Sequence, residues 1–426
     1  MTTKEQLLER RNRIMGPKAP LFYDEPVHIV RGEGVWLYDA DGNRYLDCYN
    51  NVPCVGHCHP KVVEALTAQA STLNVHTRYL HETVLEYGER LTATFDDSLS
   101  MVFMTCTGSE ANDLALRMAR RFTGSEGILC TNATYHGNTA AVDALATGFN
   151  RGQPNGPGVR AINVPDTYRA MNRLSGDALT DALIDQISEA IASLEKSGEG
   201  FAGMLVCPIY ANEGLPDLPP RYLERAAETV RVAGGLVIFD EVQAGFGRSG
   251  KMWGHEWGGV VPDICSLGKP MGNGHPVAGV VCRDDIGNHF RDGIMYFNTF
   301  GGNPVSSAVA LAVLDVIQEE GLVENALETG RYVRQGLEEL ASRYPVMDDV
   351  RGSGLFFGVE MISDASEKTP ATAEAGRLAN LMKLNGVLMS KIGIYDNVLK
   401  MRPPLCFDRD HADLLLETLS RCLEQL

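Results

Sequence analysis

The sequence lacks any apolar run long enough to cross a bilayer, which takes about 20 residues. Residues 1–10 carry charges throughout and lack the apolar core of a secretory signal peptide. The ten cysteines are scattered singly. Without a secretory signal, we expect them to be reduced thiols. Together these features predict a cytoplasmic protein that does not enter a membrane.

Basic residues are in the minority. There are 38 Lys and Arg against 55 Asp and Glu, which gives a formal net charge of −17. Nucleic-acid binding usually needs a basic face, so we expect no nucleic-acid partner. A local cationic pocket can still hold a small anionic substrate, because the field inside a cleft can differ from the global field. Apolar residues make up 44% of the 426 and charged residues 22%, a composition that supports a sizeable core.

A metal site is not expected. Cys54, His57, Cys58 and His59 are residue types that bind zinc. Zinc sites normally space their ligands more widely and close with a distant second pair, which the sequence does not offer. We interpret this segment as a loop near the edge of a sheet.

Between about residues 60 and 310, short apolar runs alternate with helical stretches. Continuous apolar runs of this kind predict strands that are buried on both faces of a mainly parallel sheet. The predicted strands are 102–105, 128–131, 204–207, 236–240, 264–267 and 277–281. The predicted fold class is therefore α/β, with a large mainly parallel sheet and a smaller α+β domain.

The two ends of the chain have other patterns. Leu7, Leu8 and Ile14 predict a short amphipathic helix. The Asp41-Gly42 pair lies between 35–38 and 44–46 and predicts a hairpin. A long helix is expected around 305–343 and a strand at 354–360. We expect residues 1–55 to join a small domain at 319–426, with the large domain at 56–318.

A Gly/Ser turn at residues 107–112 follows the predicted strand that ends at Thr105. It precedes a helix whose apolar face repeats at Leu114 and Met118. Free N–H groups at such a helix start attract a phosphate, and Ser109 can add a hydroxyl donor. An ordinary capped helix start is the alternative interpretation.

Two further residues lie at or just past the ends of predicted strands. Asp240 ends the most apolar strand, at the position where parallel sheets place ligands; it could also be a helix cap. Lys269 lies in a Gly/Pro loop after the next strand. A lysine partly removed from water can be a nucleophile, although most lone lysines are solvated.

Pyridoxal phosphate requires these three features together. Its phosphate would dock on the helix start that contains Ser109. Asp240 would keep the pyridine nitrogen protonated, and Lys269 would hold the aldehyde as an imine and later move a substrate proton.

The motifs Ser109-Glu-Ala-Asn112, Tyr135-His136-Gly137, Asp240-Glu-Val-Gln243 and Lys269 occur in this order. With them, nearly the whole chain resembles the class III, fold-type I pyridoxal-phosphate enzymes. The resemblance implies a set of cofactor residues and a homodimer with shared active sites, since one residue comes from the neighbouring subunit. These residues are Gly108 and Ser109 (phosphate), Tyr135 (stacking on the ring), His136, Asp240 (ring nitrogen), Gln243 (ring hydroxyl), Lys269 (Schiff base) and Thr299 (phosphate of the neighbouring subunit's cofactor).

Segments 47–60, 74–81, 268–276 and 400–404 resemble one branch, the ethanolamine-phosphate phospho-lyases, also called alanine–glyoxylate aminotransferase-2-like proteins. The resemblance implies that Lys269 takes a proton from the carbon bearing nitrogen and that phosphate leaves the next carbon. Cys207-Pro-Ile stands where many ω-aminotransferases have Glu-Pro-Ile or Glu-Pro-Val. Cys cannot pair with a substrate-gating Arg, so the dual recognition that a transaminase needs is not expected.

The substrate would be a phosphorylated amine, and bidentate Arg suits phosphate. The candidates to hold it are Arg78 and Arg402, with Asn50, Asn51 and His76 as nearby donors. Arg402 could instead form a structural ion pair, and Arg78 could form a salt bridge at a helix start. A transaminase remains the alternative function, because it would use the same cofactor residues and Arg402 for an α-carboxylate.

Overall fold

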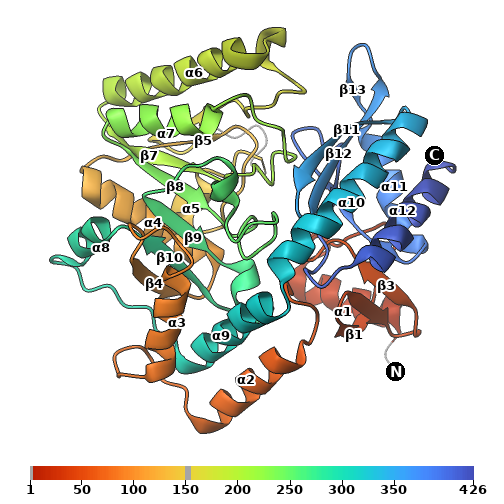
Figure 1. The fold of residues 1–426 in the computed structure, drawn as a ribbon, viewed down its shortest axis with the longest axis horizontal. Coiled ribbons are helices and arrows are strands. Elements are labelled where there is room, and N and C mark those ends of the chain that lie inside the picture. Colours follow the sequence, from red (N-terminus) through yellow and green to blue (C-terminus); the bar gives the residue numbers. More distant parts are fainter. Residues whose placement is uncertain (1–2, 149–154) are drawn as a thin grey trace.

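The computed structural model describes residues 3–148 and 155–426. A seven-stranded sheet forms the larger part of the molecule (Figure 1). Its strand order is β4-β10-β9-β8-β7-β5-β6, and β10 alone runs antiparallel to its two neighbours. The strands are β4 (Met101–Thr105), β5 (Gly127–Thr131), β6 (Val159–Ile162), β7 (Phe201–Val206), β8 (Leu236–Asp240), β9 (Ile264–Leu267) and β10 (Ala278–Cys282).

Helices cover both faces of this sheet. Side chains alternate along each strand, so Ile238 packs on one face while Val237 and Phe239 pack on the other. The first face is covered by α4 (Gly108–Thr123), α5 (Ala140–Asp143) and α8 (Asp284–Arg291). The second face is covered by α6 (Gly176–Ser197) and α7 (Tyr222–Val232), which lie together above the sheet in Figure 1.

The predicted fold class is confirmed. All six predicted strands lie in the large sheet, with bounds shifted by up to three residues at β7 and by one at β4, β5 and β10. The edge strand β6 was not predicted. Its sequence, Val-Arg-Ala-Ile, is short and interrupted by Arg160, and only its first and last residues are buried.

The smaller part of the molecule combines both ends of the chain. Its antiparallel sheet holds β11 (Met347–Ser353), β12 (Phe356–Asp364), β16 (Val398–Met401), β15 (Ser390–Ile392) and the short β13 (Thr369–Pro370). A four-stranded sheet holds β1 (Ile29–Glu33), β2 (Trp36–Asp39), β3 (Arg44–Asp47) and β14 (Val387–Leu388). The predicted hairpin is confirmed as β2–β3, with Gly42 in the turn at φ 88°. The domain boundaries given above stay predictions.

The prediction of one long helix around 305–343 is wrong, because the structure has two helices there. They are α9 (Pro304–Glu319) and α10 (Leu322–Arg343). The break falls at Gly321, whose φ of 60° is left-handed and therefore ends the first helix. The expected strand at 354–360 is confirmed as β12, which begins two residues later and ends at Asp364.

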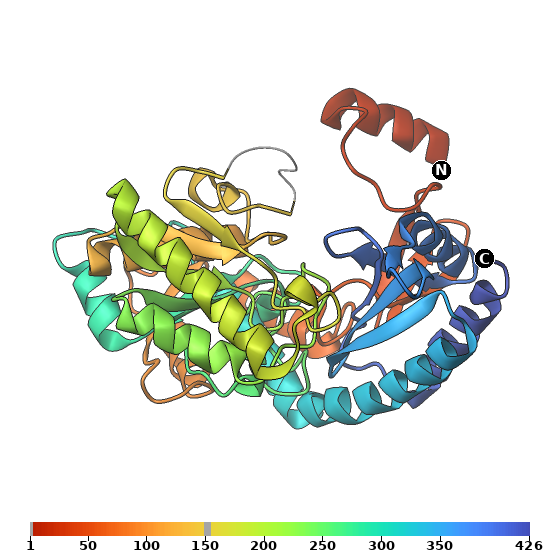
Figure 2. The same ribbon diagram turned by 90° about the horizontal axis from the view of Figure 1, so that it is seen from above.

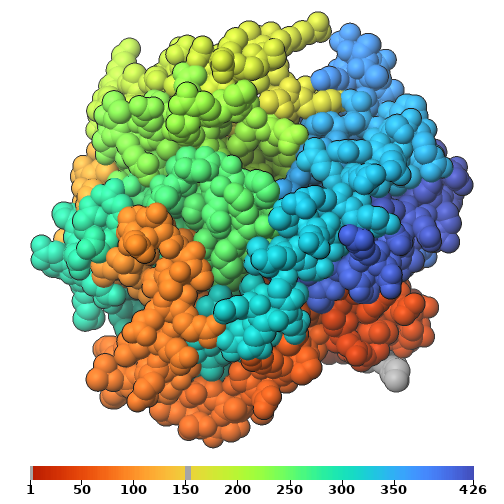
Figure 3. All heavy atoms as spheres, viewed as in Figure 1, coloured from red at the N-terminus to blue at the C-terminus, as the bar shows by residue number. Residues whose placement is uncertain are grey.

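The remaining helices lie around these sheets. They are α1 (Lys4–Met15), α2 (Pro60–Thr72), α3 (Glu82–Thr92), α11 (Thr372–Leu384), α12 (Arg409–Leu423) and the 3-10 turns η1 (Met171–Arg173), η2 (Gly254–Trp257) and η3 (Lys269–Gly272). The predicted N-terminal helix is confirmed as α1, which stands away from the rest of the chain in Figure 2. None of its residues is buried, and Ile14 and Met15 are exposed. In the space-filling view, the N-terminal segment lies beside the C-terminal one (Figure 3). Within the described residues, no helix could cross a membrane.

Candidate active site

A cavity of about 290 Å³ opens beside the carboxyl ends of β5, β7, β8 and β9. The carboxyl edge of an α/β sheet is where ligands bind. Every cofactor residue predicted from the sequence lines this cavity, except Thr299. The lining residues are Gly108, Ser109, Tyr135, His136, Gly137, Cys207, Asn212, Asp240, Val242, Gln243 and Lys269.

One end of the cavity is the start of α4. Thr107 caps this helix through a hydrogen bond from the Glu110 backbone N–H to Thr107 Oγ1 (3.2 Å). The N–H groups of the first turn have no partners within the helix. Gly137 faces Ser109 so closely that a Cβ at Gly137 would lie 2.6 Å from Ser109 Oγ. This backbone concavity, with free donors and a positive helix end, fits a phosphate group.

Asp240 lines the cavity at the end of β8. It is buried, and both of its carboxylate oxygens accept hydrogen bonds. Its Oδ2 accepts hydrogen bonds from His136 Nδ1 (2.7 Å) and Asn112 Nδ2 (3.0 Å), and its Oδ1 accepts one from the Val242 N–H (3.0 Å). Burial opposes ionisation, but the His136 hydrogen bond and the charge of Lys269 hold the pKa of Asp240 below its usual value. The carboxylate can therefore stay negative next to a cationic ring nitrogen.

Lys269 begins η3 and is exposed toward the cavity, which it lines. Gly268 lets its loop approach the start of α4, since a Cβ there would lie 3.2 Å from Gly108 Cα. Burial by the surrounding protein lowers the pKa of Lys269, against the opposing charge of Asp240. A larger neutral fraction makes the amine a better nucleophile and proton acceptor.

Gln243 joins the cavity to a buried cationic cluster. Gln243 Nε2 donates to Asn212 Oδ1 (2.9 Å). Gln243 Oε1 accepts from Lys400 Nζ (3.2 Å) and also from Arg402 Nη1. Arg402 Nε donates to the Tyr49 carbonyl (2.7 Å), so this guanidinium is held from two sides.

Sequence reasoning did not single out Asn112, Asn212 or Lys400. Asn112 lies inside the recognised 109–112 motif, and Lys400 is a lysine within an otherwise apolar strand, which is itself a signal. Asn212 carried no comparable signal. Its Nδ2 donates to the Tyr135 carbonyl (2.9 Å) and so fixes the loop that carries Tyr135.

The predicted asparagine donors lie near Gln243 but are already engaged. Asn51 Nδ2 donates to the Gln243 carbonyl (3.1 Å), and its Oδ1 accepts from Arg248 Nε (2.8 Å). Asn50 Nδ2 donates to Asp47 Oδ2 (2.9 Å). In this structure both amides hold the loop beside the cavity.

His76, Arg78 and Thr299 are not brought into the cavity of their own chain. Arg78 is exposed and stacks on the Phe297 ring, 3.9 Å from its centroid. His76 packs against the same ring at 5.6 Å. Thr299 follows on the same loop and is also exposed. These residues therefore share one outer surface.

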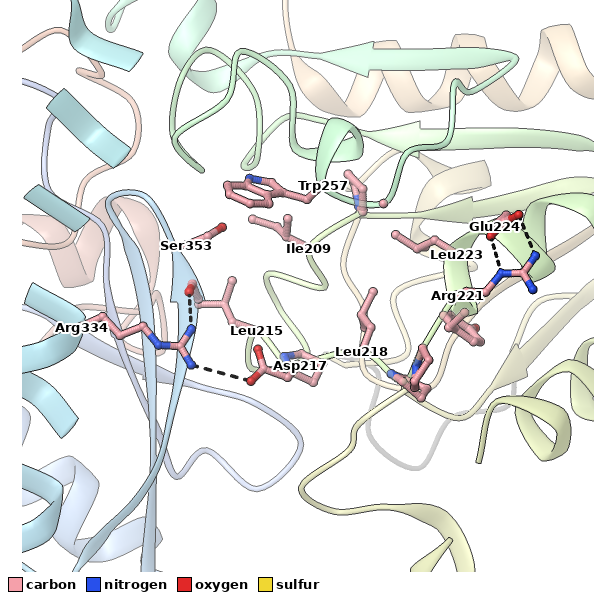
Figure 4. A pocket seen from close by; sticks show the side chains of 17 residues that line it. Ile209, Leu215, Asp217, Leu218, Arg221, Leu223, Glu224, Trp257, Arg334 and Ser353 are labelled. Carbon is pink, nitrogen blue, oxygen red and sulfur yellow. Dashed lines mark hydrogen bonds and ion pairs between the residues drawn. The ribbon is translucent and has the colours of Figure 1, made fainter. Parts of the chain in front are cut away.

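A larger cavity of about 570 Å³ lies near Ile209, Trp257 and Ser353 (Figure 4). Its charged side chains already pair with one another. Arg221 binds Glu224 at 2.8 Å, and Arg334 lies 3.9 Å from Asp217. We therefore place the chemistry in the smaller cavity. Within residues 3–148 and 155–426, no group of three or more His, Cys, Asp or Glu side chains could hold a metal ion.

The small cavity fits pyridoxal phosphate. The turn at Gly108 and Ser109 matches the phosphate, Asp240 matches the ring nitrogen, and Lys269 matches the aldehyde. The roles of the individual residues stay predictions.

Comparisons with known proteins agree with this fit. The family model for class III aminotransferases matches residues 22–423. The chain is 40% identical to the alanine–glyoxylate aminotransferase 2-like protein of Drosophila melanogaster, covering 99% of this chain and 87% of that protein. It is 36% identical to ethanolamine-phosphate phospho-lyase homolog 1 of Caenorhabditis elegans, covering 98% and 92%. A solved phospholyase from Arthrobacter, in complex with phosphoethanolamine, is 47% identical with a TM-score of 0.95, covering 99% of this chain and 100% of that one.

Proposed function

This chain belongs to the class III aminotransferase family, whose cofactor is pyridoxal 5′-phosphate, and on that premise we propose that it is a phospho-lyase. Its substrate is ethanolamine phosphate. With one water consumed, the products are acetaldehyde, ammonia and inorganic phosphate.

The observation that carries this proposal is a buried arginine without an acidic partner. Arg402 hydrogen-bonds to the Gln243 amide and the Tyr49 carbonyl, which are both uncharged. No carboxylate pairs with it among residues 3–148 and 155–426. Cys207 lines the cavity as a thiol, and burial raises its pKa, so it adds no negative charge. A buried guanidinium of this kind favours an anionic substrate group.

The comparisons support phosphate as that group. The Arthrobacter phospholyase was solved with phosphoethanolamine, and the Caenorhabditis elegans relative is named for the same substrate. Ethanolamine phosphate has no carboxylate, so its phosphate is the only anionic group that Arg402 could bind.

When bound, pyridoxal phosphate supplies an electron sink for a C–H bond broken next to the amine nitrogen. Asp240 keeps a proton on the ring nitrogen, because its own carboxylate stays ionised. Lys269, with a lowered pKa, takes the proton from the carbon that bears nitrogen. Arg402 binds the phosphate, whose bridging oxygen keeps the electron pair of the broken C–O bond and gains charge.

A homodimer would complete the site. Tyr79, Leu80, Met295 and Phe300 are exposed large apolar residues on the two segments that carry Arg78 and Thr299. Such a patch favours a protein contact. We propose that a second copy covers it, that Thr299 then reaches the partner's cofactor phosphate, and that Arg78 and His76 reach the partner's substrate. We propose a cytoplasmic location.

A transaminase is the second candidate, because Arg402 could equally bind an α-carboxylate and a relative is named as aminotransferase-like. A product assay separates the two. Purified holoenzyme with ethanolamine phosphate should release phosphate and acetaldehyde in equal amounts without a keto acid. No phosphate release, together with rapid amination of the cofactor by alanine, would establish the transaminase instead.

A further inference from the structure

Two cations lie together at the end of β16. Lys400 is in this strand, Arg402 follows its last residue, Met401, and both side chains donate to Gln243 Oε1. Both lie over the ring of Phe356, with Lys400 Nζ 5.4 Å and Arg402 Cζ 5.9 Å from its centroid. Only 3% of Lys400 and 7% of Arg402 is exposed.

Lys400 has no acidic partner. Its Nζ donates to Gln243 Oε1 (3.2 Å) and to the Ala211 carbonyl (3.3 Å), which are both uncharged. An ammonium has three N–H donors, so one is left for another acceptor. In the part of the chain that the structure describes, no carboxylate lies within ion-pair distance of Lys400.

Burying an unpaired ammonium is costly, because the charge loses its hydration without gaining a counter-charge. Accordingly, burial and the nearby charges of Arg402 and Lys269 lower the pKa of Lys400 well below its usual value. Lys400 at this position therefore lowers the stability of the folded chain.

The surrounding groups do not supply the missing negative charge. Asp240 is already bonded to His136 and Asn112. Burial raises the pKa of Glu213, whose Oε1 accepts a hydrogen bond from Thr131 (2.5 Å). Burial also raises the pKa of the Cys207 thiol. One amide oxygen, Gln243 Oε1, is shared by both cations.

We propose that Lys400 is a substrate-binding residue that, together with Arg402, holds the dianionic phosphate of the substrate. One carboxylate needs only one cation, whereas a phosphate monoester carries a charge near −2 at neutral pH and three terminal oxygens. The pair thus selects a dianion over an α-amino acid. The uncharged oxygen of Gln243 lies between the cations, where a phosphate oxygen would be more strongly bound.

This inference rests on the proposed function, and two variants test it. Lys400→Met removes the charge at similar volume, and Lys400→Arg keeps it. In holoenzyme, Lys400→Met should lower kcat/KM for ethanolamine phosphate by about 30-fold, since removing one partner of a buried charged contact costs at least 2 kcal/mol. For Lys400→Arg, the decrease in the logarithm of kcat/KM should be less than half of the decrease for Lys400→Met. The rate at which alanine converts the cofactor to its amine form should change less than about threefold, because one carboxylate needs only Arg402.

Binding of inorganic phosphate to the holoenzyme, measured by calorimetry, gives a readout without turnover. The cofactor already fills the site at Ser109, so added phosphate reports on the second site. Wild-type protein should bind it more tightly than Lys400→Met at pH 7.5, and the difference should shrink at pH 5.5, where added phosphate is mostly a monoanion. Equal binding and equal kcat/KM in wild type and Lys400→Met would overturn the inference and leave the lyase proposal intact. If wild type releases no phosphate from ethanolamine phosphate, the proposed function fails, and the calorimetry alone decides whether Lys400 serves an anion.

Discussion

Asp240, the acidic end of the cavity, differs in its pairing from the buried cations Lys400 and Arg402, which hydrogen-bond to the cavity residue Gln243 and are called the cationic end below. Asp240 has three hydrogen-bond donors within 3.0 Å, from His136, Asn112 and the Val242 backbone. Among residues 3–148 and 155–426, Lys400 and Arg402 have only uncharged acceptors, and they share Gln243 Oε1. A charged side chain that already has its partners is held in one position before any ligand binds. A buried charge without a counter-charge gains the most binding free energy when an oppositely charged ligand arrives. On the proposed function, the acidic end would serve the resident cofactor, and the cationic end would serve an exchanging anion.

The charge of Lys269 acts on both ends, and loss of this residue should have the largest effect. We expect Lys269→Ala to lower turnover by about 10⁴-fold, because both proton transfer and cofactor attachment are lost. The visible absorbance of the lysine-bound cofactor should disappear, while circular dichroism and dimer mass stay unchanged. If that absorbance persisted, another lysine would hold the cofactor and the site assignment would be wrong.

Asp240→Asn tests whether the acidic end acts through charge. Asparagine can still accept a hydrogen bond, but it cannot hold a proton on the ring nitrogen electrostatically. We expect kcat to fall by about 100-fold, as for other losses of electrostatic stabilisation. The cofactor should remain bound after dialysis, because Ser109 and Lys269 are intact. A variant with wild-type kcat would remove the assigned role of Asp240.

At the cationic end, we expect Arg402→Ala to reduce kcat/KM for ethanolamine phosphate by about 30-fold or more. Part of the loss should appear in kcat, because phosphate gains charge as it leaves. Arg402→Lys is the matched control and should recover part of the activity. If Arg402→Ala left phosphate release unchanged but abolished the reaction with alanine, Arg402 would bind a substrate carboxylate and not a phosphate.

Arg78 lies on the outer surface, so we expect a smaller loss from Arg78→Ala, about tenfold in kcat/KM. Mixed dimers show where it acts. In a hybrid of Lys269→Ala and Arg78→Ala chains, one site would regain both residues if Arg78 reaches across the interface. The hybrid should then show half of the wild-type activity. A hybrid no better than Arg78→Ala alone would mean that Arg78 does not reach the partner's site.

Lys400→Met should also change the stability of the apoenzyme. Because the folded-state pKa of Lys400 is lowered, the unfolded state binds more protons, and wild-type stability should rise with pH toward the ordinary lysine pKa. Lys400→Met has no ammonium at this position and therefore lacks this pH-dependent contribution to stability. In apoenzyme, we expect it to exceed the wild type in free energy of unfolding by about 1–4 kcal/mol near pH 7, and by less at pH 9.5. Urea unfolding at both pH values measures the gap. A gap that grows with pH would contradict an unpaired buried ammonium.

Sequence reasoning worked where local order determines position. Asp240 and Lys269 follow apolar strands, so the parallel sheet brings them to one edge. It missed β6, because Arg160 interrupts this four-residue edge strand and leaves no continuous apolar run. It also missed the break at Gly321, since one left-handed residue hardly alters the apolar period.

The cationic cluster depends on tertiary contact. Gln243 and Lys400 are 157 residues apart in the sequence, so nothing local indicates that their side chains meet. Arg78 and Thr299 were predicted to serve active sites, but one chain leaves both exposed, and the dimer that would bring them there is a proposal.

The central claim is that Lys400 and Arg402 receive the substrate's phosphate. A crystal structure of Lys269→Ala holoenzyme soaked with ethanolamine phosphate tests it most directly, because this variant should bind the substrate without turning it over. The account predicts a phosphate that contacts both Arg402 Nη1 and Lys400 Nζ, with the amine directed toward the cofactor. A phosphate held elsewhere, with both cations still bonded only to Gln243 Oε1, would contradict it.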